Sequence, residues 1–244
     1  MVARKRSGAR PLVVALSVVI AGGVALSACQ FPRDPDGTLD RASGGTIRVG
    51  VGQRMPWAGW DGDRPVGAEV DLVTAMARRL HARLEWARGS DEELLQALEK
   101  RALDVVAAGL EAKSPWGSTV SFTRSFLTTR SVLAVGPGVP APRRLHDVTV
   151  AAPPDGADAA LLREHGAHVV AEDRRDVPRL VEDWQLGPEL RRTGVKLMEV
   201  KHVLALPLGE NAWLLRVNRL LEGSAERARR SLRRLHPEEG GARE

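Results

Sequence analysis

Cysteine is almost absent from this sequence. The 244 residues include one cysteine, Cys29, so no disulfide bond can form within the chain. Catalytic patterns are missing as well, because no Ser-His-Asp spacing or cluster of metal ligands is present and the six histidines are scattered. The closest pair, His165 and His168, flanks Gly166 at a predicted helix end, and is not a helical i, i+4 pair of metal ligands. We therefore expect no metal, no cofactor and no catalytic residue.

Acidic residues are absent from the first 28 residues, which carry four basic ones. Without those four charges the net charge of the chain falls from +5 to about +1. A nearly neutral chain has little electrostatic attraction for phosphate groups. We expect no nucleic-acid partner.

No apolar run is clearly long enough to cross a membrane. The longest, residues 12–28, falls a little short of the roughly 20 residues that a span needs, and Gly22-Gly23 interrupts it. A basic start, an apolar centre and small residues before Cys29 are the layout of a secretory signal. Residues 26–29, Leu-Ser-Ala-Cys, also resemble the bacterial lipobox, in which the cysteine is diacylated.

We predict a lipoprotein signal peptide over residues 1–28, with lipid attachment at Cys29. The lipid would hold the exported protein at the extracytoplasmic face of the cell membrane. A plain secretory signal and a transmembrane anchor are the alternatives. Residues 29–45 are rich in proline, aspartate, glycine and serine and have no apolar period, so we interpret them as a flexible tether.

Strand and helix patterns alternate from Thr46 onward. Ser90-Asp91-Glu92-Glu93 is a capping box that opens the second helix. The alternation of strand and helix predicts an α/β fold, with a parallel-rich sheet and flanking helices. Strands are expected at 46–51, 84–86 and 103–108, and helices at 70–80 and from residue 91.

Two later stretches, 131–135 and 202–206, resemble each other, and each is predicted to be a strand that ends near glycine and proline. The 140–200 segment between them has its own smaller pattern, with strands at 148–151 and 169–171 and a helix at 157–164 that Gly166 closes.

The chain ends with two more predicted helices, the first beginning at Asn211 and the second covering 225–235. The second carries five arginines opposite an apolar stripe. We interpret them as a solvated face rather than a surface for nucleic acid or anionic lipid; they are Arg227, Arg229, Arg230, Arg233 and Arg234.

Several short motifs stand in a consistent order along the chain. They are Pro56-Trp57, the Gly-Ala-Glu-Val-Asp-Leu of residues 67–72, the helix-turn-strand of 98–109, and residues 120–123, 182–184 and 209–211. In this order they resemble the bacterial extracellular solute-binding proteins of the amino-acid-binding type, family 3, which supply ABC transporters. The resemblance is good from residue 46 to 137 and thin from 138 to 200.

The resemblance implies a two-lobed periplasmic-binding-protein-like fold of type II, with two crossing strands as the hinge and the ligand between the lobes. Lobe one would hold residues 46–134 plus 203–236. Residues 135–202 would form the hinge strands and a small lobe two. Residues 237–244, at the end of the chain, would be a disordered tail. The family has a helix and a strand where this chain has residues 171–182, and Pro178 is unfavourable to a buried strand. The second lobe is therefore expected to be shortened.

The resemblance also implies an altered ligand site. In the family, a Ser or Thr and then an Arg, after the strand that ends at Gly109, hold the ligand's α-carboxylate. Here those positions hold Glu111 and Trp116, and Glu111 would repel a carboxylate. The family's acid for the ligand ammonium resembles Asp183. Gly156-Ala157 matches a position whose N–H groups can bind an anion, although an acid follows directly.

Carboxylates and indole faces together suit a cationic or amine ligand without a free carboxylate. For each tryptophan, core or hinge packing is the alternative, and for Glu111 it is a solvent-exposed loop acid. The ligand-binding residues that we expect are Trp57, Trp60, Gly109, Leu110, Glu111, Trp116, Gly156, Ala157 and Asp183.

The first functional hypothesis is a monomeric, membrane-anchored receptor that delivers a small polar, cationic or amine-like solute to an ABC permease. The second is a degenerate solute-binding-like lipoprotein that acts as a sensor or partner-binding module. The third, an enzyme such as a dehydratase on the same scaffold, is the least favoured, because no catalytic spacing is present.

Overall fold

The computed structural model describes residues 33–235, except residues 155–156 and 172. The predicted signal peptide, Cys29, Gly156 and the predicted tail at 237–244 lie outside the described residues. Among the residues that the structure describes, no helix is both long and apolar enough to cross a membrane.

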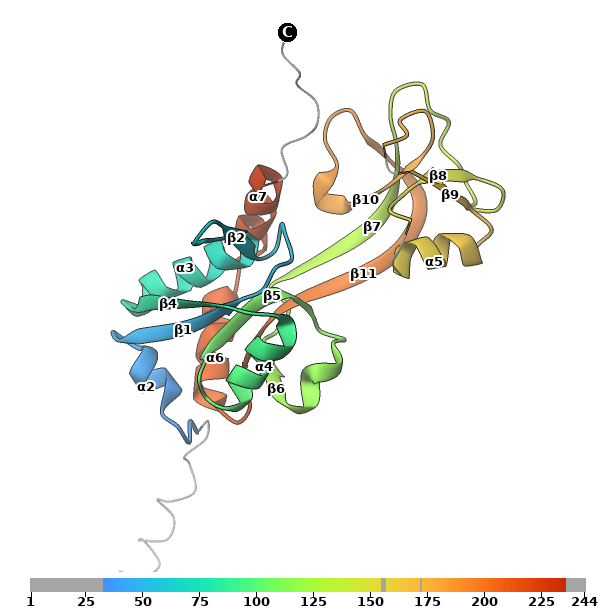
Figure 1. Cartoon of the computed structure of the whole chain (residues 1–244). Helices are drawn as coiled ribbons and strands as arrows, with labels where there is room; N and C mark the ends of the chain where they lie inside the picture. Colours follow the sequence, from blue (N-terminus) through green and yellow to red (C-terminus); the bar gives the residue numbers. More distant parts are fainter. Residues whose placement is uncertain (1–32, 155–156, 172, 236–244) are drawn as a thin grey trace, which may run out of the picture.

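One mixed sheet runs through the described part of the molecule (Figure 1), with its strands in the order β4-β1-β5-β11-β7-β10-β8-β9 and β6 paired to β11. The bounds are β1 (Thr46–Val51), β4 (Arg83–Arg88), β5 (Val105–Glu111), β6 (Val120–Phe122), β7 (Leu127–Val135), β8 (Thr149–Ala151), β9 (His168–Val170), β10 (Arg179–Glu182) and β11 (Arg191–Pro207). A separate hairpin pairs β2 (Gly59–Asp61) with β3 (Arg64–Val66).

Figure 1 shows two lobes, with the long antiparallel strands β7 and β11 passing from one to the other. In lobe one, β1 pairs in parallel with β4 and β5. In lobe two, β8 pairs in parallel with β9 and β10. The two look-alike segments of the sequence are therefore parts of the two connecting strands, which are longer than the pattern predicts because their outer residues lack a continuous apolar run.

Helices cover both lobes. Lobe one carries α2 (Thr38–Ala42), α3 (Ala68–Leu80), α4 (Asp91–Glu99), α6 (Asn211–Leu221), α7 (Ala225–Leu235) and the 3-10 turn η1 (Pro115–Ser118); lobe two carries α5 (Ala157–Glu164) and the 3-10 turn η2 (Asp183–Gln185). The predicted capping box of α4 is confirmed, because Ser90 and Glu93 cap each other's backbone N–H groups. Gly166 has the left-handed φ of 78° expected at the end of α5.

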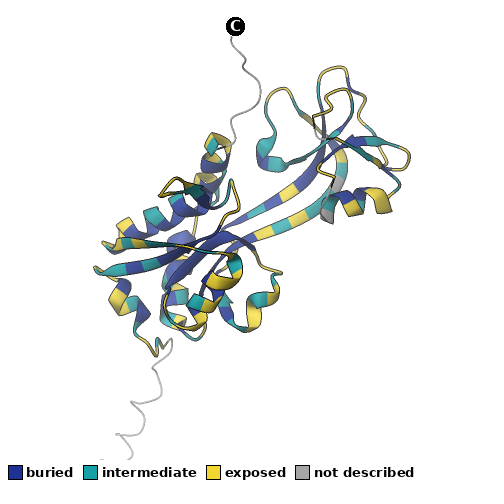
Figure 2. Ribbon diagram, viewed as in Figure 1, coloured by how far each residue is buried: buried dark blue, intermediate teal, exposed yellow. Residues whose placement is uncertain are grey.

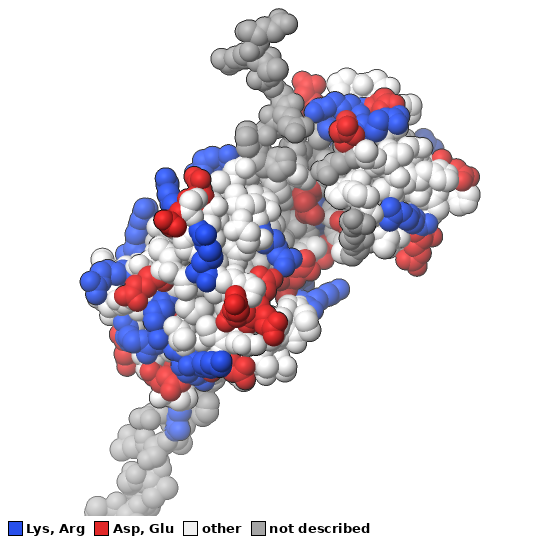
Figure 3. All heavy atoms as spheres, in the orientation of Figure 1, with Lys and Arg blue, Asp and Glu red and all other residues white. Residues whose placement is uncertain are grey.

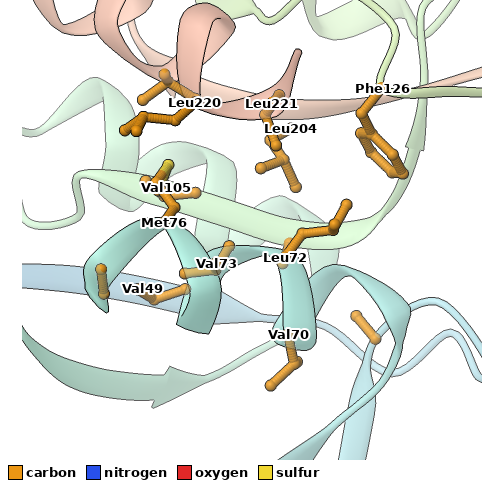
Figure 4. Packing of buried hydrophobic residues seen from close by; sticks show 14 of the residues in the cluster. Val49, Val70, Leu72, Val73, Met76, Val105, Phe126, Leu204, Leu220 and Leu221 are labelled. Carbon is orange, nitrogen blue, oxygen red and sulfur yellow. The ribbon is translucent and has the colours of Figure 1, made fainter. Parts of the chain in front are cut away.

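Three apolar clusters form the core, and the strands that cross between them are largely buried (Figure 2). The first lies between the sheet and helices α3, α6 and α7, where Met76 and Leu204 are almost fully buried (Figure 4). The second lies under α4 and η1, and the third lies in lobe two under α5. The first two clusters form the core of lobe one and the third forms the core of lobe two. Each fully buried large apolar side chain in them stabilises the fold by about 1.5–3 kcal/mol.

The interpretation of residues 29–45 as a flexible tether is wrong for the described part, residues 33–45. Asp34 accepts hydrogen bonds from the backbone N–H groups of Ala212 (2.8 Å) and Trp213 (3.0 Å), and so caps α6. The buried Glu210 accepts bonds from the N–H groups of Asp36 and Thr38, both at 3.0 Å. Polar residues anchor this segment through caps, which an analysis of apolar periodicity does not detect.

Pro178 makes a buried strand unfavourable in residues 171–182, but the structure has a strand there. β10 begins directly after Pro178 and lies between β7 and β8. The proline precedes the strand, so its missing N–H removes no bond from β10, while its carbonyl accepts the N–H of Ala151 at 2.9 Å.

Candidate functional site

Trp57, in the loop after β1, stacks on His202 of the connecting strand β11. The ring centroids are 3.6 Å apart and the planes differ by 18°. His202 is only 5% exposed, and its Nε2 lies 2.9 Å from Oγ1 of Thr129 on β7. The predicted site residue Trp57 therefore contacts one of the two strands that connect the lobes.

His202 is a neutral imidazole at physiological pH, because burial lowers its pKa to about 4. In the tautomer that carries the proton on Nε2, His202 donates to Thr129, whose own hydroxyl proton is then available to Glu182. Within the described residues, His202 Nδ1 is buried without a hydrogen-bond partner. That nitrogen is a free acceptor beside the tryptophan.

Two carboxylates of lobe two share one hydroxyl group. Ser131 Oγ lies 2.7 Å from Asp158 Oδ2 and 3.2 Å from Glu182 Oε1. Glu182 is the cross-strand partner of Ser131, and Asp158 is in the first turn of α5. A hydroxyl has one proton, so it cannot donate fully to both acids. Among the described residues, the other oxygens, Asp158 Oδ1 and Glu182 Oε2, are buried without a partner.

Burial raises the pKa of Glu182, and the nearby charges of Asp158 and Asp183 raise it further, while hydrogen bonds from Thr129 and Ser131 oppose the rise. A buried oxygen without a donor costs free energy. A bound cation with N–H donors would remove that cost and favour the ionised form of Glu182.

These contacts form two groups that strand β7 joins. Trp57 stacks on His202, which contacts Thr129, and Ser131, two residues further along β7, contacts Glu182 and Asp158. Figure 3 shows Asp and Glu side chains at the waist between the two lobes. We name these six residues the hinge cluster.

Glu69, in the first turn of α3, is hydrogen-bonded to the backbone near the end of β5. Its Oε2 accepts the N–H of Gly109 at 3.0 Å, and the side chain is fully buried. Burial raises the pKa of Glu69 to about 8, so it is largely protonated at neutral pH. Within the described residues, Oε1 has no hydrogen-bond partner.

Gly109 is needed at its position for two reasons. Its φ of 63° is left-handed, and a Cβ there would lie 2.5 Å from Cδ of Arg54. The stem of Arg54 thus covers the start of the predicted ligand loop, while its guanidinium pairs with Asp91 at 2.8 Å. The group beside Gly109 is therefore an arginine stem whose charge is already paired.

The structure places the remaining predicted residues in different surroundings. Leu110 belongs to the second apolar cluster and the half-buried Trp116 packs against it, while Trp57 and Trp60 pack against the first. Trp60 Nε1 donates to the carbonyl of Val51 at 3.1 Å, and the guanidinium of Arg88 lies 4.6 Å from its ring centroid. Polar and stacking contacts within lobe one thus hold Trp60.

Glu111 is exposed at the end of β5, where it lies opposite His202 in the pairing with β11. It lines a hollow of about 230 Å³ that Lys113, Glu199 and Lys201 also line. Ala157 begins α5. Asp183 begins η2, and its carboxylate, 9% exposed, lies 3.4 Å from the guanidinium of Arg229.

The geometry of two lobes joined by two long strands agrees with a comparison against protein-family models. The model of the bacterial extracellular solute-binding proteins, family 3, matches residues 47–228. The chain belongs to this family. A family 3 protein is a solute-binding protein, and the family prediction made from the short motifs is confirmed.

Solved structures share the same mixed α/β fold. The unliganded, open L-cystine solute receptor of Neisseria gonorrhoeae is 18% identical, with a TM-score of 0.64, over 81% of this chain and 94% of that one. An ancestral cationic amino acid solute binding protein is 17% identical, with a TM-score of 0.65, over 81% and 99%.

The scaffold also occurs in an enzyme: an ancestral cyclohexadienyl dehydratase is 18% identical, with a TM-score of 0.59, over 80% of this chain and 94% of that one. At such identities the likeness is one of fold. Comparison with curated protein sequences gives no match.

Sequence analysis missed most of the hinge cluster of this family 3 protein, although a signal was present. Each of the two look-alike segments begins with a polar residue before four apolar ones, Ser131 in the first and His202 in the second. A polar residue that opens an otherwise apolar strand requires a partner. The structure supplies those partners from other elements.

Proposed function

We propose that this family 3 protein binds a small cationic amine between its lobes and delivers it to an ABC permease. In this proposal it acts without catalysis and as a monomer. The observation that carries the proposal is the pair of half-buried carboxylates, Asp158 and Glu182, which share the hydroxyl of Ser131 and, among the described residues, each retain a buried oxygen without a hydrogen-bond partner.

An ammonium or guanidinium group supplies what this pair lacks. It brings a positive charge and several N–H donors, and charge-assisted hydrogen bonds are among the strongest in proteins. The indole of Trp57 offers a face for the same cation, on the lobe-one side of His202. The Nδ1 atom of His202 would accept one further N–H.

The proposed ligand lacks a free carboxylate. The two positions that resemble the family's carboxylate clamp hold Glu111, which is exposed, and Trp116, which packs against the second apolar cluster. An ionised Glu111 has no donor, and Trp116 has only its neutral indole N–H, so neither replaces the charged, two-donor clamp of a guanidinium. Arg54 lies beside Gly109, but its guanidinium already pairs with Asp91.

Ligand entry and release would follow from motion about β7 and β11, the strands that connect the lobes. We propose residues 46–134 plus 203–236 as lobe one and residues 135–202 as the hinge strands with a smaller, shortened lobe two. Because the hinge cluster takes residues from both lobes and both strands, a bound cation would favour the closed arrangement.

A thermal-shift panel on residues 30–244 tests the proposal. It compares amines such as putrescine and agmatine with neutral amino acids, acidic amino acids and sugars. We expect the amines to raise the melting temperature in a concentration-dependent way, and the Asp158→Asn/Glu182→Gln double variant to lose the rise. A larger rise with an acidic amino acid or a sugar would overturn the proposal.

We further propose that a diacylated Cys29 holds the protein at the extracytoplasmic face of the membrane. Membrane fractionation of cells that express the full chain tests this point. We expect the wild-type protein in the membrane fraction and the Cys29→Ser variant in the soluble exported fraction. Equal partition of the two forms would contradict the anchor and would leave the ligand proposal untouched.

A further inference from the structure

A second hollow lies in lobe two and shares no residue with the hinge cluster. Its volume is about 560 Å³, within the roughly 300–1,000 Å³ typical of small-molecule sites. It lies between the loop that precedes β8, the second half of α5 and the lobe-two part of β11. The residues that line it are Arg143, Arg144, Leu145, His146, Leu161, His165, Val195 and Leu197.

Half of the lining residues are apolar and half are arginine or histidine. Leu145, which is 8% exposed, belongs to the third apolar cluster, and Val195 and Leu197 pack against that cluster. With Leu161 they form an apolar surface next to basic groups. No acidic residue is among the lining side chains.

Among the described residues the two arginines have no ion-pair partner, and the neighbouring carboxylate of Asp147 lies 2.8 Å from His146 Nδ1. Within the described residues, neither Arg143 nor Arg144 makes an ion pair or a hydrogen bond, and both are exposed. Two other arginines of lobe two are engaged: Arg163 donates to the carbonyl of Pro154 at 2.8 Å, and Arg174 pairs with Asp176 at 2.5 Å. Two adjacent guanidinium groups are therefore available to an anion.

Backbone contacts hold the loop that carries Arg143, Arg144 and His146 in place. The N–H of Asp147 donates to the carbonyl of Gly166 at 2.9 Å, and the N–H of Val148 donates to the carbonyl of Leu145 at 3.1 Å. His146 lies against Gly166, where a Cβ would approach its ring to 3.0 Å. These contacts fix the loop to the end of α5, so much of the hollow exists before any ligand binds.

We propose that this hollow binds an anionic amphiphile, whose acidic head group pairs with Arg143 and Arg144 and whose short apolar body covers Leu161, Val195 and Leu197. A guanidinium binds a carboxylate or phosphate through parallel N–H···O bonds, and the apolar surface gains free energy when it is removed from water. A cation would be repelled, and a neutral apolar molecule would leave the arginines unpaired. The head group could come from a free solute or from a membrane lipid.

Titration calorimetry on residues 30–244 tests the proposal with decanoate, decyl phosphate and decyltrimethylammonium, each below its micelle concentration. We expect both anions to bind and the cation not to bind. The Arg143→Glu/Arg144→Glu variant should bind decanoate at least about ten-fold more weakly. The matched control, Arg227→Glu/Arg233→Glu, reverses two exposed arginines of α7 and should bind as the wild type does.

A second variant separates binding from folding. Leu161→Asn changes the apolar surface without touching the arginines, and should weaken decanoate binding while its melting curve stays cooperative. Glu182→Gln, in the hinge cluster, should leave decanoate binding unchanged, so this test is independent of the proposed amine site. Equal binding of the cationic and anionic amphiphiles, or unchanged affinity in the charge-reversed variant, would overturn the proposal.

The source of the head group is distinguished by sedimentation with vesicles. Binding to phosphatidylglycerol vesicles but not to phosphatidylcholine vesicles, lost in Arg143→Glu/Arg144→Glu, would assign the site to a lipid head group. Binding of decanoate without binding to either vesicle would assign it to a free solute. Failure of decanoate, decyl phosphate and the anionic vesicles alike would remove the site.

Discussion

Arg229 of helix α7 lies 3.4 Å from Asp183, the acid that begins η2 in lobe two. The same guanidinium donates to the backbone carbonyl of Thr128 on the connecting strand β7, at 3.2 Å. The neighbouring Trp184 is 4% exposed and belongs to the apolar cluster of lobe one. Asp183 therefore has a cation from its own chain, and the amine is expected at Glu182 and Asp158 instead.

Replacement of Arg229 by alanine should destabilise the protein. Asp183 is 9% exposed and would lose its counter-charge, so we expect a loss of roughly 1–3 kcal/mol in the free energy of unfolding. Urea denaturation measures it. Arg227→Ala on the exposed side of the same helix is the control, with an expected change within about 0.5 kcal/mol. Equal losses in the two variants would show that the ion pair contributes nothing.

The stability of the protein should fall as pH rises from about 4.5 to about 8, because of Glu69. Its pKa is about 8 in the folded state against an ordinary value of 4.5. Across that window the unfolded chain releases a proton that the folded chain keeps, so the unfolded state gains stability, by at most roughly 5 kcal/mol. Above about pH 8 Glu69 is ionised in both states, so its effect on the free energy of unfolding no longer changes with pH.

Glu69→Gln removes the titration while its amide oxygen can still accept the N–H of Gly109. We expect a flatter pH profile in this variant, measured as denaturation midpoints at pH 5, 6.5 and 8. Glu92→Gln, at an exposed residue of α4, is the control and should keep the wild-type slope. A wild-type slope in Glu69→Gln would mean that Glu69 ionises normally.

Binding of an amine should weaken as pH falls. Burial raises the pKa of Glu182, and the cation favours the ionised carboxylate, so protonation at lower pH competes with the ligand. We expect Glu182→Gln to lose about ten-fold or more in affinity at neutral pH and to have a flatter pH profile. Glu199→Gln, at an exposed acid that pairs with Arg130, should change neither. Calorimetric titration with agmatine from pH 5 to pH 8 measures both effects.

The tryptophans should separate into a binding residue and a packing residue. Trp57→Ala removes the ring that stacks on His202, and should lower amine affinity by about five-fold or more through the lost cation–π contact. Trp116→Ala, against the second apolar cluster, should instead lower the free energy of unfolding by roughly 1–3 kcal/mol. A larger loss of affinity in Trp116→Ala than in Trp57→Ala would reverse the assignment.

Local patterns predicted the local structure well. Alternation in residues 46–51, the capping box at Ser90 and the glycine at 166 depend on neighbours in the sequence, and the structure confirms each. The family followed from short motifs in a fixed order. These signals are encoded within a few residues, so no knowledge of the fold is required.

Contacts between distant residues could not be predicted in the same way. Asp34 caps a helix that begins at Asn211, and Ser131 brings together Asp158 and Glu182 from two other elements. Each of these residues alone resembles an ordinary polar surface residue. The pairing of β7 with β10 brings Ser131 to Glu182, and the packing of α5 and of the segment before α2 brings in Asp158 and Asp34.

The central claim is that the protein recognises a cation and not a carboxylate. The most direct measurement is a pair of calorimetric titrations of residues 30–244, one with argininamide and one with arginine. The two ligands share a guanidinium and an α-amino group and differ in the free carboxylate. We predict that argininamide binds about ten-fold or more tightly than arginine. Tighter binding of arginine, or of any ordinary α-amino acid over its amide, would contradict the account.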